Sequence, residues 1–123
     1  MTALRTLLFL EAASLVGAAI LHTGALTGGP PDDAAMYETG IAVILAVGLG
    51  ITFIQTGWAR LTGLVVQAIA LVGASIGTYA TLRGFGPSSP LDVVYHVVLI
   101  GLIVAGLAVA WRLPASGREA PTG

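Results

Sequence analysis

The sequence predicts an all-α membrane protein, a bundle of four transmembrane helices in up-down-up-down order. Hydrophobic residues make up 56% of the 123 residues and charged residues only 9%, whereas a soluble domain usually has about 25% charged residues. Four apolar stretches, separated by short turn-forming segments, each approach the roughly 20 residues that span a bilayer core. We therefore expect one transmembrane domain over residues 1–113.

The four helices are expected at about residues 4–26, 36–56, 61–82 and 91–111. The first is interpreted as a membrane helix and not as a cleaved signal peptide, because Glu11 would interrupt the uncharged part of a signal. Ser89, Pro90 and Asp92 form a typical helix start, with a cap, a proline in the first turn and an early carboxylate. Residues 114–123 are polar, and we expect them to form a disordered cytoplasmic tail.

The arginines predict the orientation in the membrane. If the four segments alternate, all arginines but Arg83 fall on one side, namely Arg5, Arg60, Arg112 and Arg118. Because positive residues accumulate on the cytoplasmic side, both termini are expected there, with the protein integral to the plasma membrane. The use of Arg without Lys, together with many Ala, Gly and Val residues, indicates a GC-rich and hence bacterial genome.

Composition also excludes several functions. The chain has no cysteine, so disulfides, thiolate metal sites and thiol catalysis are ruled out. The net charge of −1 argues against a nucleic-acid partner, which requires a basic face. The sequence contains no phosphate-binding glycine loop, nucleophile elbow or nucleophile–base pair, and we expect no enzyme activity.

An inner polar pair is predicted from Glu11 and Gln67. Counted from Arg5 and Arg60, both lie roughly 10 Å inside the cytoplasmic face at about 1.5 Å per residue. An ionisable side chain at that depth is costly and is therefore a candidate for function. Two interpretations stay open, a proton-binding carboxyl of a coupled carrier and a hydrogen bond that holds helices together. A charged partner on another protein is a third.

An outer polar layer is predicted near the opposite face, as a candidate ligand site. Each helix contributes one side chain at a similar depth, namely His22, Glu38, Tyr79 and His96. In a bundle with short loops the first and fourth helices are neighbours, so the two histidines are expected to approach each other.

Two His and one carboxylate (His22, Glu38 and His96) are a ligand set for a divalent metal, and two His alone are axial ligands for haem. The alternative, a hydrogen-bonded layer without a cofactor, is favoured because neither histidine has ligand spacing within its own helix. Tyr79 also fits a belt of interfacial aromatic residues.

In size, and in carrying Glu11 in its first helix, the chain resembles the small multidrug resistance exporters, which are four-helix membrane proteins. It departs from them because its third helix has no Trp and Tyr79 lies at the outer end of that helix. The four-helix fluoride channels are similar in size only, since their Asn and Phe pattern is absent. The sequence alone assigns no family.

The function that the sequence favours is a non-enzymatic accessory or assembly subunit, acting in the lipid bilayer as a homo-oligomer or within a larger membrane complex. The first alternative is a proton-coupled carrier or channel that works as an oligomer, with Glu11 as the titrating group. The second alternative is an electron-transfer protein that binds haem, a metal or a quinone through His22 and His96.

Overall fold

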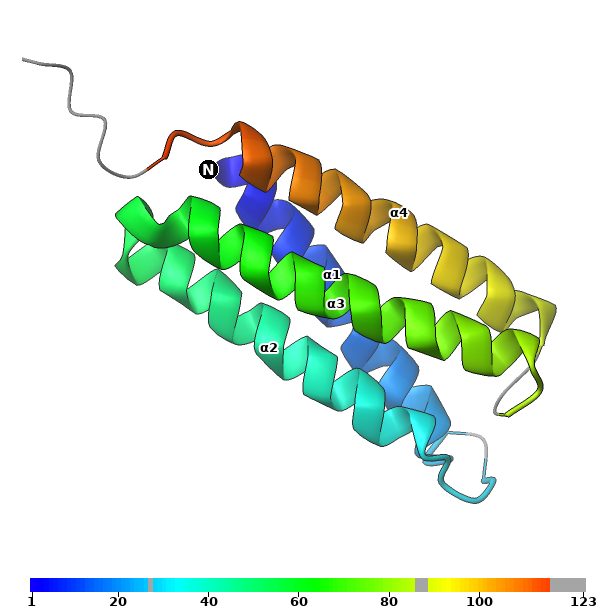
Figure 1. Cartoon of the computed structure of the whole chain (residues 1–123). Helices are drawn as coiled ribbons and strands as arrows, with labels where there is room; N and C mark the ends of the chain where they lie inside the picture. Colours follow the sequence, from blue (N-terminus) through cyan, green and yellow to red (C-terminus); the bar gives the residue numbers. More distant parts are fainter. Residues whose placement is uncertain (27, 86–88, 116–123) are drawn as a thin grey trace, which may run out of the picture.

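The computed structural model describes residues 1–26, 28–85 and 89–115, and all regular structure in this part of the chain is helical (Figure 1). The helices are α1 (Thr2–His22), α2 (Ala34–Ile54), the short 3₁₀ helix η1 (Thr56–Trp58), α3 (Ala59–Leu82) and α4 (Pro90–Arg112). The four α-helices are long and apolar enough to cross a membrane. This confirms the predicted set of four membrane-length helices.

The helices form a closed ring in which each packs against the next, and α1 completes the ring by packing against α4. The most extensive contacts join α1 to α2 and α3 to α4. The start of α1, the α2–α3 connection and the end of α4 lie at one end of the bundle, called the terminus end (Figure 1). The other two connections lie at the opposite, distal end.

The turn after α1 begins earlier than predicted. α1 ends at His22, four residues before the expected end, because Gly24 takes a left-handed backbone conformation with φ of 73°. A Cβ at Gly24 would lie 2.1 Å from the Gly29 carbonyl oxygen, so the turn is too tight for a side chain. The Asp32 amide then donates to the His22 carbonyl at 2.8 Å. This bond fixes His22 at the last position of its helix.

The start of α4 has the predicted form. The Ser89 side chain accepts from the Asp92 amide, and the Asp92 carboxylate accepts from the Ser89 amide at 3.0 Å. Pro90 is the first helical residue. This reciprocal cap satisfies amide groups that have no partner within the helix. It also sets the direction of the Asp92 side chain, which matters for the site below.

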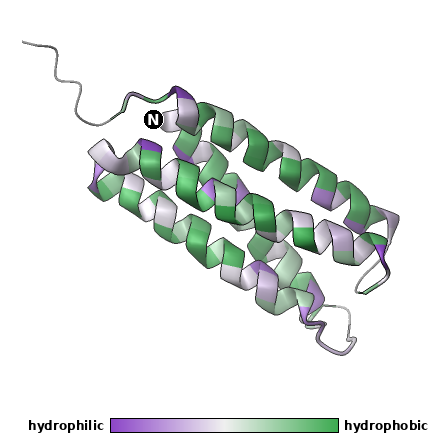
Figure 2. Ribbon diagram, in the orientation of Figure 1, coloured by the Kyte–Doolittle hydropathy of each residue, from purple (hydrophilic) through white to green (hydrophobic). Residues whose placement is uncertain are grey.

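The core is built from leucines that fit against small residues. Leu4, Leu8, Leu15 and Leu45 are almost completely buried. Glycines bring the backbones close together; for example, a Cβ at Gly63 would lie 2.9 Å from the Leu4 side chain. Figure 2 shows hydrophobic colours along the middle of the helices and hydrophilic colours gathered near their ends. Many large apolar side chains point outward, as expected of a surface that lipid covers.

Candidate functional site

The two residues of the inner polar pair, Glu11 and Gln67, contact each other. Gln67 on α3 donates from Nε2 to Glu11 Oε1 on α1 at 3.1 Å, across the centre of the bundle. Both residues are 0% exposed to solvent. The other two oxygen atoms of the pair, Glu11 Oε2 and Gln67 Oε1, are buried and have no hydrogen-bond partner. The pair is therefore fully buried, and only two of its four polar side-chain atoms are hydrogen-bonded within the described chain.

The Gln67 amide is held in place by a glycine on α4. A Cβ added at Gly106 would lie 2.0 Å from Gln67 Nε2 and 2.6 Å from its Cδ. Gly106 is thus the residue that lets α4 pack over the amide without displacing it. Nothing in the sequence pairs Gly106 with Gln67, because the two residues lie on different helices and are 39 positions apart.

At the distal end, His22 lies between two carboxylates from different helices. Its Nδ1 contacts Glu38 Oε2 of α2 at 2.8 Å, and its Nε2 lies 3.9 Å from Asp92 Oδ1 of α4. These three side chains, called the distal cluster, join α1, α2 and α4. They are only partly exposed, because 15% of the His22 side chain, 10% of Glu38 and 22% of Asp92 are accessible.

Asp92 is a site residue that the sequence did not reveal. One oxygen, Oδ2, accepts from Ser89 in the helix cap, while the other, Oδ1, faces His22. The sequence explained Asp92 completely as a capping residue. Its second role depends on α1 lying next to α4, which only the folded chain establishes.

His96 is held in a different way from His22. Its Nδ1 contacts the Asp92 carbonyl one turn earlier at 2.8 Å, and its ring meets the Tyr95 ring edge to face at 5.4 Å. A Cβ at Gly77 would lie 2.9 Å from His96 Nε2, so this nitrogen points at the backbone of α3. Both ring nitrogens therefore face groups of the bundle itself.

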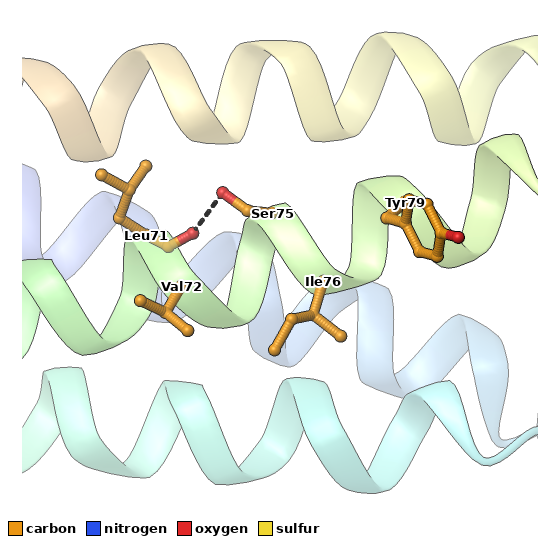
Figure 3. Close-up of a pocket in the computed structure, with 5 residues that line it drawn as sticks. All are labelled: Leu71, Val72, Ser75, Ile76 and Tyr79. Atoms are coloured by element: carbon orange, nitrogen blue, oxygen red, sulfur yellow. Dashed lines mark hydrogen bonds between the residues drawn. The ribbon is translucent and has the colours of Figure 1, made fainter.

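Tyr79 does not join the other members of the predicted outer polar layer. It is 59% exposed, and the Arg83 guanidinium lies 5.7 Å from the centre of its ring. It lines an open, mostly apolar groove on α3 with Leu71, Val72, Ser75 and Ile76, as Figure 3 shows. This exposed position beside an apolar groove is typical of an interfacial aromatic residue.

Metal-binding geometry is absent from residues 1–26, 28–85 and 89–115, where no group of three or more His, Asp or Glu side chains is arranged to hold an ion. The predicted set was His22, Glu38 and His96. His22 binds Glu38 directly, whereas His96 turns its two nitrogens to the Asp92 carbonyl and to Gly77. The arrangement suits proton exchange between a histidine and carboxylates, and it suits an ionic link between helices.

The fold and these polar groups define a class, a helical bundle of membrane length whose interior holds two separate polar levels. Compared with known protein families, curated proteins and solved structures, the chain matches none.

Proposed function

We propose that the chain is an integral protein of the bacterial plasma membrane that acts as a non-enzymatic accessory or assembly subunit. The arginine distribution supports cytoplasmic termini, which makes the terminus end the inner end and the distal cluster the outer end. The chain then works through contacts made within the bilayer, with a second copy or with a larger complex.

The observation that carries this proposal is the way the interior is filled. Polar side chains on different helices bond to one another, as in the contacts of Gln67 with Glu11 and of His22 with Glu38, although one oxygen each of Glu11, Gln67 and Tyr95 has no partner within the described chain. Two open grooves lie on the outer surface, one on α3 and one between α1 and α2. These outer grooves are surfaces on which a second copy or another membrane protein could pack. Helices in a membrane associate through close packing and polar contacts.

The test is purification of the full chain in native lipid nanodiscs, followed by measurement of particle mass and of the absorption spectrum. The expected result is a particle heavier than one chain, containing either several copies or a defined partner, and no visible absorption. A particle with a single chain contradicts the proposal. A haem band that disappears in both His22→Ala and His96→Ala would favour the electron-transfer alternative instead.

A second candidate is a proton-coupled carrier that functions as an oligomer, with Glu11 as the titrating group. What favours it is the half-bonded state of the inner pair. Ion or drug flux into liposomes should then collapse in Glu11→Gln, which keeps the shape and loses the titration, while Gln55→Glu serves as a control at an exposed site. Unchanged flux in Glu11→Gln would exclude a titrating role.

A further inference from the structure

The groove between the start of α1 and the end of α2 is polar at the terminus end and apolar further along the helices. Its walls are formed by Thr2, Arg5, Thr6 and Phe9 of α1 and by Leu49 and Phe53 of α2. The three polar side chains all precede Phe9, so polarity falls over about 10 Å along α1. The polar region of one bilayer leaflet is roughly 5–8 Å thick. The groove therefore has the order of a phospholipid, with the headgroup end first and the acyl end second.

Arg5 is the charged group of this groove, and α2 holds its guanidinium in place. Its Nε donates to Thr52 Oγ1 at 3.3 Å, and a terminal nitrogen donates to the Thr52 carbonyl. The guanidinium carbon also lies 4.1 Å from the centre of the Phe53 ring, which is a cation–π distance. These hydrogen bonds use two of the five N–H donors of an arginine and neutralise no charge. Three donors and the whole positive charge remain for anionic oxygens, which an arginine binds strongly.

The terminus end carries positive charge that the described chain does not compensate. Besides Arg5 it contains Arg60, the second residue of α3, and Arg112, the last residue of α4 (Figure 1). Among the described carboxylates, Glu11 is fully buried in the interior. The others belong to the distal end and are Asp32, Asp33, Glu38 and Asp92. Within the described residues no ion pair joins an arginine to a carboxylate. The charge of this end is thus complementary to an anionic partner.

The groove on α3 lacks this combination of charge and apolar wall. It is lined by Leu71, Val72, Ser75, Ile76 and Tyr79, and none of these side chains is a cation. An apolar helix can cover such a surface without burying a charge. Over the α1–α2 groove the same helix would enclose the Arg5 guanidinium without a counter-charge, which is costly. The α1–α2 groove therefore favours a ligand that is anionic at one end and apolar at the other.

We propose that the α1–α2 groove binds one anionic phospholipid. The phosphate lies at the Arg5 guanidinium, where the hydroxyls of Thr2 and Thr6 add donors, and an acyl chain lies along the apolar wall. If the terminus end is cytoplasmic, this lipid belongs to the inner leaflet, where basic pockets between membrane helices bind anionic headgroups. The site needs the membrane setting proposed above but not the assembly role, and it leaves the α3 groove to a protein neighbour.

The test measures which lipids stay bound to the full chain. The chain is reconstituted in bilayers of equal parts phosphatidylglycerol and phosphatidylcholine and extracted in mild detergent, and its retained lipids are counted by native mass spectrometry. We expect the native chain to retain phosphatidylglycerol over phosphatidylcholine by about fivefold, and Arg5→Gln to lose this preference. Arg112→Gln is the matched control, because it removes the same charge from an exposed position at the same end but outside the groove. It should keep the native ratio.

Thr6→Trp is the second variant, because Thr6 is exposed and a large side chain there fills the groove while Arg5 keeps its bonds to Thr52. This variant should also lose the preference for phosphatidylglycerol. Thermal unfolding in the same detergent shows whether each variant is folded. If Arg5→Gln does not fold, the result for Thr6→Trp decides.

A native chain that retains both lipids equally would overturn the site, and so would a native ratio in a folded Arg5→Gln or in Thr6→Trp. An equal loss in Arg112→Gln would overturn it too, since binding would then follow overall charge. A lipid-free dimer that Thr6→Trp converts to a monomer would assign the groove to a second copy instead. Release of the chain from membranes by alkaline washing would contradict the membrane setting itself, an outcome distinct from loss of the lipid preference in a chain that needs detergent.

Discussion

The inner pair and the distal cluster both join a carboxylate to a hydrogen-bond donor on another helix, yet they differ in their access to water. Glu11 and Gln67 are 0% exposed and bond through an amide, whereas His22, Glu38 and Asp92 remain partly accessible and include a group that carries positive charge when protonated. The difference follows from depth. Near the interface, water and headgroups tolerate charge, while the middle of a bilayer-length bundle requires neutral and mutually bonded groups.

The two polar levels are stabilised by different interactions. The inner pair depends on packing, since Gly106 must leave room for the Gln67 amide. The distal cluster depends on electrostatics that salt and water weaken. Substitutions at the two levels should therefore differ in size and in salt dependence. Stability in the predictions below is the free energy of unfolding, measured by SDS titration in mixed micelles.

The largest effect is expected for Gly106→Ala. The added methyl overlaps the Gln67 amide and forces it off Glu11, which should cost about 3 kcal/mol from overpacking and the lost hydrogen bond. Gly101→Ala is the matched control on the same helix, because a Cβ there meets no atom within 4 Å. Equal stability of the two variants would show that Gly106 does not position the inner pair.

Next in size is Gln67→Leu, which leaves the Glu11 carboxyl buried without its donor. We expect a loss of about 2 kcal/mol, the cost of an unsatisfied buried polar group. The double variant Glu11→Leu with Gln67→Leu removes both partners and should recover most of that loss. If the double variant is instead less stable by the sum of the two single effects, the pair is not coupled.

A smaller effect is expected for His22→Ala in the distal cluster. Loss of its contacts with Glu38 and Asp92 should cost about 1 kcal/mol, because the groups are partly exposed. The loss should shrink as salt is raised, whereas the loss in Gln67→Leu should stay constant. A salt-independent effect at His22 would mean that the two levels do not differ as described.

The smallest effect is expected for Tyr79→Phe. Tyr79 is exposed and its hydroxyl bonds to no member of the distal cluster in the described chain, so stability should change by less than about 0.5 kcal/mol. A loss comparable to that of His22→Ala would place Tyr79 in the outer polar layer after all.

Composition and hydropathy were sufficient to predict four helices of membrane length. The apolar stretches are long enough to cross a bilayer, and in lipid a chain satisfies its backbone hydrogen bonds within helices. The inner pair could also be proposed by counting residues from Arg5 and Arg60, because distance along a helix is proportional to residue number. The predicted cap at Ser89, Pro90 and Asp92 was right since it depends only on local contacts.

The helix ends and the members of the outer polar layer were harder to predict from the sequence. The end of α1 moved to His22 because the turn at Gly24 packs against Gly29, a contact that no local pattern announces. Tyr79 was predicted in the outer polar layer from its position along the helix, but its side chain is exposed on the surface of α3. Depth is a one-dimensional quantity, and it does not tell which side chains of equal depth face one another.

By itself, then, the sequence determined the number of helices that are long and apolar enough to cross a membrane and the position of each polar group along its helix. The tertiary structure alone decided which of these groups meet: it placed Asp92 beside His22 and Gly106 over Gln67. The physical reason is that hydrophobicity and residue spacing act along one chain, whereas rotation and packing of the helices are set by contacts between residues far apart in sequence.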